Sequence, residues 1–244
     1  MQDEWVPEHY YHLIGKAAHS GELLFREEED YLHFLQRTFK DQLHVVFQFL
    51  VYCLLPNHFH AVIRTRPAAH VLETLREVDA LGSRLTASQR NFLAGQADYK
   101  TLVKNTFSGA TAGYAARYNH KYGRTGQLLL RPTLHGLTDK GPALGRAYSR
   151  TLGAYVGLNY AKHGYAAHTD FYAYSSLSNP LYRICELDIP HYYGSDEAYK
   201  EFHLRYMRTY GATFYNFDEE EFFAALTQRR YDAEAARWEI GDWY

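Results

Sequence analysis

Two histidines separated by one residue, His58 and His60, are the side chains of this chain that most clearly suggest chemistry. They lie in a largely apolar run, residues 58–65, which predicts a β-strand. Side chains alternate between the two faces of a strand, so we expect both imidazoles on one face and Phe59 on the other. Two imidazoles on one face make half of a metal site. A further ligand and a reactive group must then come from elsewhere in the chain.

A predicted helix over residues 141–163 offers both. Tyr155 and Asn159 are four residues apart, which places them one turn apart on the same helix face. The amide oxygen of Asn159 is a third candidate ligand, and this set leaves coordination positions open for water and substrate oxygens. The phenol of Tyr155 becomes a nucleophile where cations or a metal favour the phenolate. Its attack on a phosphodiester would form a phosphotyrosine and release a 3′-hydroxyl.

Charge is distributed unevenly along the chain, although the net charge is only −2. Residues 100–165 carry ten Lys and Arg but a single acid, Asp139, whereas residues 1–99 and 166–244 are acidic overall. A basic segment between two acidic ones favours an anionic ligand over a merely solvated helix surface. The candidate phosphate-binding side chains are Lys16, Lys121, Arg124, Arg131, Arg146, Arg150 and Lys162.

The elements that must position these side chains follow from hydrophobic periodicity and turn residues. Strands are expected over residues 9–17, 43–54, 58–65 and 127–136, and Pro56-Asn57 forms the turn between the second and the third. Helices are expected from Arg26 to about Phe39, within residues 66–98, over 99–122 and over 141–163. This order predicts an α+β domain with a small antiparallel sheet and helices over one face.

Composition limits the class of protein. The chain has 244 residues, of which 46% are hydrophobic and 22% charged, as in an ordinary globular protein. Its 23 tyrosines suit wet binding surfaces and base stacking. Two cysteines, Cys53 and Cys185, fit a reducing compartment. The absence of a signal peptide and of an apolar run near about 20 residues predicts a cytoplasmic protein without membrane contact.

Three motifs carry a resemblance to a known family. Residues 55–60 read Leu-Pro-Asn-His-Phe-His, residues 118–126 read Tyr-Asn-His-Lys-Tyr-Gly-Arg-Thr-Gly, and residues 155–159 read Tyr-Val-Gly-Leu-Asn. Together they resemble the single-tyrosine HUH transposases of insertion sequences, and within these the REP-associated tyrosine transposases. Shorter matches are Tyr10-Tyr11-His12, Lys162-His163-Gly164 and Tyr174-Ser175-Ser176. The resemblance covers roughly residues 9–177.

The resemblance implies a transposase domain over residues 1–177, with a ferredoxin-like (RRM-like) antiparallel sheet and helices mainly on one face. Residues 178–244 would form an acidic, mostly helical extension. The implied activity is site-specific cleavage and joining of single-stranded DNA, usually at hairpins, by a monomer or a homodimer. By the same resemblance Tyr155 is the nucleophile, and the ligands of a magnesium or manganese ion are His58, His60 and Asn159.

The chain departs from the family pattern at three places. Tyr160 stands where the family usually has proline, so the last helix is free to continue. The first strand ends Leu13-Ile14-Gly15-Lys16 instead of Asn-Arg-Gly, which puts recognition of the DNA end in question. Leu128-Leu129-Leu130 replaces an aromatic position, while Arg131 keeps the charge.

Two further residues are weighed as members of the site. Tyr148 lies seven residues before Tyr155 on about the same helix face, and packing against the sheet is the favoured interpretation. His12 is interpreted as a hydrogen-bonded core histidine.

Two other functions stay open. A non-catalytic, domesticated protein would bind hairpin DNA without metal. A zinc hydrolase would use the same two histidines and the amide oxygen, since this ligand set does not exclude zinc. Formation of a phosphotyrosine separates the transposase from both alternatives.

Overall fold

The computed structural model describes residues 5–136, 152–167 and 172–176, together with residues 195, 197, 198 and 201. Four strands form one antiparallel sheet in the order β2-β3-β1-β4. They are β1 (Tyr10–Lys16), β2 (Phe47–Leu55), β3 (His58–Thr65) and β4 (Thr133–Gly136). With a helical segment after β1 and another after β3, this order is that of a ferredoxin-like βαββαβ fold. The expected α+β class is confirmed.

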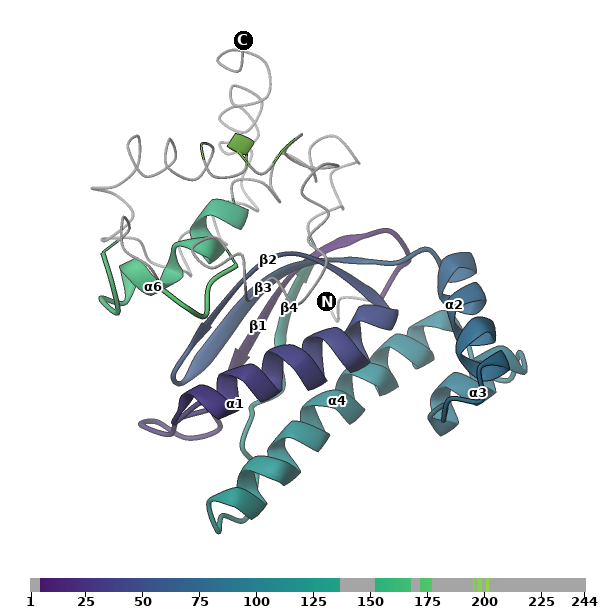
Figure 1. The fold of residues 1–244 in the computed structure, drawn as a ribbon, viewed down its shortest axis with the longest axis horizontal. Coiled ribbons are helices and arrows are strands. Elements are labelled where there is room, and N and C mark those ends of the chain that lie inside the picture. Colours follow the sequence, from purple (N-terminus) through teal and green to yellow (C-terminus); the bar gives the residue numbers. More distant parts are fainter. Residues whose placement is uncertain are drawn as a thin grey trace.

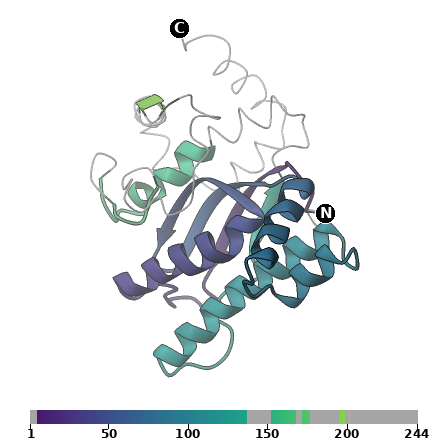
Figure 2. The ribbon, with the colours of Figure 1, turned by 45° about the vertical axis from the view of Figure 1, so that its right-hand side comes forward.

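Helices lie on both sides of the sheet, with most of them on one (Figures 1 and 2). The first layer contains α1 (Glu28–His33), its continuation η1 (Phe34–Gln42) and α4 (Tyr99–Lys121). The shorter helices α2 (Ala68–Ala80) and α3 (Ala87–Leu93) connect β3 to α4. On the opposite side lie the helical residues 152–157 and α6 (Asn159–Lys162).

Aromatic side chains fill the space between the sheet and the first helical layer. The ring of Phe59 lies 5.0 Å from that of Phe34, which in turn contacts Tyr114 edge to face at 4.8 Å. Phe59 therefore faces this layer, as its position between two histidines predicted. Its ring occupies the space above Gly15, where a Cβ atom would lie 2.2 Å from the ring. The packing of Phe59 thus requires glycine at position 15.

Three elements differ from the sequence prediction. Leu43–Val45 form a 3₁₀ turn, η2, instead of the start of β2, and the side chain of Arg66 binds the carbonyl of His44 at 2.8 Å. Residues 34–42 are wound as a π-helix. The fourth strand is reduced to β4 and a single bridge between Leu129 and Ala17, because Pro132 has no N–H to donate.

A short segment, residues 172–176, extends the sheet beyond β2. Leu54 N donates to Tyr174 O at 3.0 Å, and Ser176 N donates to Tyr52 O at 3.0 Å. The hydroxyl of Ser175 is buried and donates to Gly157 O at 2.6 Å. The segment therefore joins the edge of the sheet to the helical residues 152–157.

The expected C-terminal extension, residues 178–244, lies outside the described residues apart from the four named above, and so does the helix start at residue 141. In the part that the structure describes, no helix is long and apolar enough to cross a membrane.

Candidate active site

The two histidines project from β3 toward the helical residues 152–162. His60 is fully buried and His58 is half-buried. The rings of the two histidines lie 5.2 Å apart, and the ring of Tyr155 lies 6.0 Å from that of His60, nearly perpendicular to it. Strand alternation therefore places both imidazoles on the face that Tyr155 covers, as the sequence predicted.

Asn57, in the turn before β3, orients the first histidine. Its side-chain oxygen lies 2.7 Å from Nδ1 of His58. An amide oxygen only accepts, so the ring nitrogen is the donor. The proton of a neutral His58 then sits on Nδ1, and Nε2 carries the lone pair that a metal needs.

His60 is held in its neutral form. Burial lowers the pKa of His60 well below its ordinary value, and the neighbouring His58, His163, Lys16 and Lys162 lower it further. A neutral imidazole is the form that binds a metal ion. The burial that removes His60 from water thus also keeps it ready to act as a ligand.

Asn159, the third candidate ligand, is the first residue of α6 and lies four residues after Tyr155. Its side chain is fully buried, and neither amide atom has a hydrogen-bond partner among the described residues. A buried amide left in this state costs free energy, and such groups are rare unless they serve a ligand. The two imidazoles and this amide oxygen fit a divalent cation, which would polarise a phosphodiester oxygen.

Within the described ranges, no group of three or more His, Cys, Asp and Glu side chains is arranged to hold a metal ion. A third ligand drawn from these ranges would therefore have to be a side chain of another kind, such as the amide of Asn159. Sequence spacing placed it there only by assuming a continuous helix, whereas the structure interrupts the helix at Leu158.

Lys162 is the polar neighbour of the candidate nucleophile. Its ammonium donates to the Tyr155 hydroxyl at 3.2 Å and lies 5.0 Å from the centre of the Tyr155 ring. An ammonium in this position stabilises a phenolate more than a phenol. The helix α6 continues past Tyr160, as the replacement of proline allows, and ends at Lys162, before Gly164 with φ +73°.

A surface pocket of about 420 Å³ opens beside the histidines. Five of its lining residues are basic or imidazole side chains: Lys16, His19, His58, Lys162 and His163. Lys16 pairs directly with His58 across β1 and β3, and the rings of His58 and His163 lie 4.8 Å apart. The pocket thus combines cationic groups with one candidate ligand, which suits an anionic substrate.

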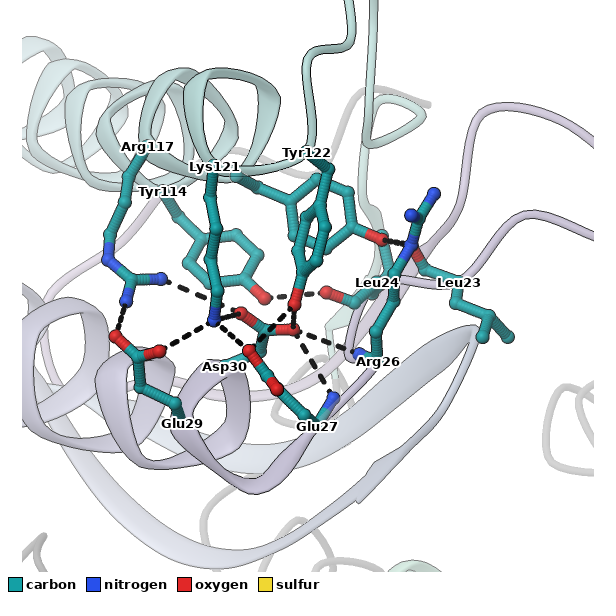
Figure 3. A network of polar contacts seen from close by, with 11 residues as sticks. Leu23, Leu24, Arg26, Glu27, Glu29, Asp30, Tyr114, Arg117, Lys121 and Tyr122 are labelled. Carbon is teal, nitrogen blue, oxygen red and sulfur yellow. Dashed lines mark hydrogen bonds and ion pairs between the residues drawn. The ribbon is translucent and has the colours of Figure 1, made fainter.

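Two of the predicted phosphate-binding residues have carboxylate partners instead. Lys121 forms ion pairs with Glu27, Glu29 and Asp30 at 2.5, 2.7 and 3.0 Å, and these tie α4 to α1 (Figure 3). Arg124 forms an ion pair with Glu22. A phosphate would have to compete with these carboxylates, so the structure favours a structural role for both cations.

Of the three other arginines predicted to bind phosphate, the structure describes one. Arg131 is exposed in the segment that leads into β4. Arg146 and Arg150 lie outside the described residues, as does Tyr148. DNA contact therefore stays a prediction for all of them.

Sequence reasoning missed one site residue, Asn57, whose position directly before a candidate ligand is close enough to orient it. The interpretation of His12 as a hydrogen-bonded core histidine is confirmed, since it is buried, and its Nε2 lies 3.0 Å from Nδ1 of His60. The sequence does contain a signal for this proximity. His12 is a polar residue at an even-numbered position of the first strand, which is the face that carries the histidines.

No protein-family model matches the sequence, and no curated protein matches it. Among solved structures, the chain is similar to that of a REP-associated tyrosine transposase bound to a REP hairpin. The TM-score is 0.41 at 14% sequence identity, over 72% of this chain and 81% of that one. This is a distant similarity of fold, and a function has to be inferred from the site residues.

Proposed function

We propose that the protein is a metal-dependent enzyme that cleaves and rejoins single-stranded DNA through Tyr155, as a transposase does. The main support is the approach of the Tyr155 ring to His60 at 6.0 Å, together with the burial of Asn159, whose amide has no hydrogen-bond partner among the described residues. A candidate nucleophile beside a candidate ligand is what this chemistry needs. The motif resemblance adds hairpin DNA as the substrate.

In the proposed step, the Tyr155 oxygen attacks the scissile phosphorus and the P–O3′ bond breaks. The strand end then carries a free 3′-hydroxyl, and the 5′-phosphate stays on the tyrosine. The Tyr155 phenol gives its proton to solvent, Lys162 stabilises the resulting phenolate, and the departing 3′ oxygen takes a proton from solvent. The reverse attack by a 3′-hydroxyl rejoins a strand, because the phosphotyrosine keeps the phosphodiester bond energy.

Access to the nucleophile requires motion. The Tyr155 side chain is fully buried, whereas Lys162 is only partly buried and lines the pocket. The reacting phosphate must therefore displace the Lys162 contact or shift residues 152–162. Those residues are attached to β2 through the Ser175 hydrogen bond to Gly157 O, which keeps the tyrosine near His60 in the resting state.

The test uses a hairpin with a single-stranded flank, labelled at either end, with magnesium or manganese. A label at the 3′ end should migrate with the protein on a denaturing gel, and a label at the 5′ end should appear on a free fragment. Tyr155→Phe should abolish the adduct. Tyr160→Phe, a change at another buried tyrosine, is the matched control and should keep it.

Other outcomes assign the alternatives. An adduct that persists in Tyr155→Phe would show that the nucleophile is wrong. Hairpin binding without an adduct, unchanged by His58→Ala, would point to a non-catalytic DNA-binding protein. Zinc-dependent cleavage without an adduct would point to a hydrolase.

A further inference from the structure

His12 lies next to His60 across the two central strands. In the β1–β3 register, Ile14 faces His60, so His12 is the diagonal neighbour of His60 on the same face. Both side chains are fully buried, and their rings stack with centroids 5.2 Å apart and an interplanar angle of 21°. This close approach depends on the strand register, which no local sequence pattern reveals.

The two rings share one hydrogen bond. Nε2 of His12 lies 3.0 Å from Nδ1 of His60, a distance that requires a proton between the two nitrogens. If both rings are neutral, the proton belongs either to His12 or to His60. With the proton on His60 Nδ1, the lone pair of His60 lies on Nε2. With the proton on His12, that lone pair is used to accept the hydrogen bond.

His58 shows which arrangement a metal site would require. Its Nδ1 donates to Asn57 at 2.7 Å, which leaves Nε2 as the coordinating atom. If His60 donates through Nδ1 in the same way, both histidines present Nε2 to one cation. The two ligands would then be oriented by two different partners, one in the turn before β3 and one on β1.

We propose that His12 is a positioning residue, which accepts a hydrogen bond from Nδ1–H of His60 and thereby presents Nε2 of His60 to a divalent cation. The inference rests on the proposed metal site but not on the DNA chemistry. Partners that orient a ligand in this way typically contribute about 10–100-fold to metal affinity.

The first measurement is the dissociation constant for Mn²⁺, obtained by electron paramagnetic resonance of the free ion. His12→Phe keeps an aromatic ring but has no acceptor, and should weaken binding by about 10–100-fold. His12→Gln offers an amide oxygen to Nδ1–H, and should restore most of the affinity. Unchanged binding in His12→Phe would overturn the proposal, as would equal losses in both variants.

The second measurement is made on the wild-type protein, and a variant serves only to assign the signals. In ¹⁵N–¹H correlation spectra of the wild-type protein with Mg²⁺, the proton of His60 should reside on Nδ1. The His60 ring signals are assigned by their loss in His60→Asn. A His60 ring protonated at Nε2 in the Mg²⁺-saturated protein would overturn the proposal, because that nitrogen could not bind the ion.

The two proposals fail in different ways. Mn²⁺ binding that depends on His12, in a protein that forms no DNA adduct, would support the role of His12 and contradict the proposed strand cleavage. An adduct that forms with unchanged Mn²⁺ affinity in His12→Phe would support the cleavage and contradict the role of His12. Tyr155→Phe should bind Mn²⁺ as the wild type does, which separates metal binding from chemistry.

Discussion

At the scale of single residues, the site is built from side chains that do little for stability. Asn159 is the clearest case, because its buried amide has no hydrogen-bond partner among the described residues. A buried polar group in this state typically costs about 1–3 kcal/mol. The proposed role of Asn159 as a metal ligand would explain why the fold retains such a group.

This cost makes a testable prediction about Asn159. The change Asn159→Leu, of similar size, should leave the free energy of unfolding without metal unchanged or raise it by up to about 1–3 kcal/mol. It should also abolish Mn²⁺ binding and adduct formation. Urea unfolding and the binding measurement check the two parts separately.

Ser175→Ala provides the matched control for a buried polar group that does have a partner. Its hydroxyl donates to Gly157 O at 2.6 Å, so its removal should lower the free energy of unfolding by about 1 kcal/mol. A larger loss of stability in Asn159→Leu than in Ser175→Ala would contradict the interpretation of Asn159 as a ligand awaiting its metal.

At the scale of elements, Phe59 anchors the strand that carries the histidines, because its ring packs on the opposite face of the sheet. The Phe59 ring occupies the space over Gly15 in the neighbouring strand. This packing is possible only because position 15 has no Cβ atom. Gly15 therefore has a packing reason in this chain.

Gly15→Ala should destabilise the protein by about 1–3 kcal/mol, because the added methyl group would overlap with the Phe59 ring. Gly109→Ala, in α4, is the matched control, since a Cβ there meets no atom within 4 Å. It should stabilise the helix by about 0.5–1 kcal/mol. Thermal or urea unfolding of both variants tests the contrast, and equal effects would show that the Phe59 contact is unimportant.

The contact between α1 and α4 has its own pH dependence (Figure 3). Burial alone would raise the pKa of Asp30, but hydrogen bonds from Tyr122, the Arg26 backbone and Lys121 outweigh it, and the pKa is lowered. A carboxyl whose pKa is lower in the folded state stabilises the fold above its unfolded pKa. That stability is lost as the pH falls through this value toward the folded pKa.

The prediction is a stability difference that depends on pH. Asp30→Asn should be less stable than the wild type at pH 7, and the difference should shrink as the pH falls below about 4, the ordinary pKa of an aspartate. Unfolding by urea at several pH values measures it. A difference that stays constant down to pH 2 would mean that the charge of Asp30 contributes nothing.

At the scale of the whole molecule, the basic residues separate into those that hold the fold and those that line the pocket. Lys121 is paired with three carboxylates between α1 and α4, whereas Lys16 is exposed at the pocket beside His58. Among the described residues of the basic segment 100–165, Lys121 is thus held in ion pairs while Lys162 lines the pocket, so their charges do not serve one surface.

Lys16→Ala should weaken binding of single-stranded DNA and lower the slope of log affinity against log salt by about one unit. Lys121→Ala should lower the free energy of unfolding and leave that slope unchanged. Lys40→Ala, at an exposed position on η1, is the control for a general loss of charge. A slope altered by Lys121→Ala and not by Lys16→Ala would reverse the assignment.

Much of this molecule is determined by local sequence. Strand alternation sends His58 and His60 to one face and Phe59 to the other, because successive side chains of any extended chain point in opposite directions. The order of strands and helices, and hence the α+β class, follows from periodicities that neighbouring residues carry. Tyr155 and Asn159 remain near each other despite the break at Leu158, since only one residue interrupts the helix.

Only the tertiary structure decides which partners these residues meet. His12 reaches His60, 48 residues away, through the register of β1 against β3. Lys121 contacts Asp30, 91 residues away, because α4 packs against α1. Such contacts depend on how whole elements pack, and hydrophobic burial determines that packing. Buried polar side chains then pair with the groups that the packing brings near them.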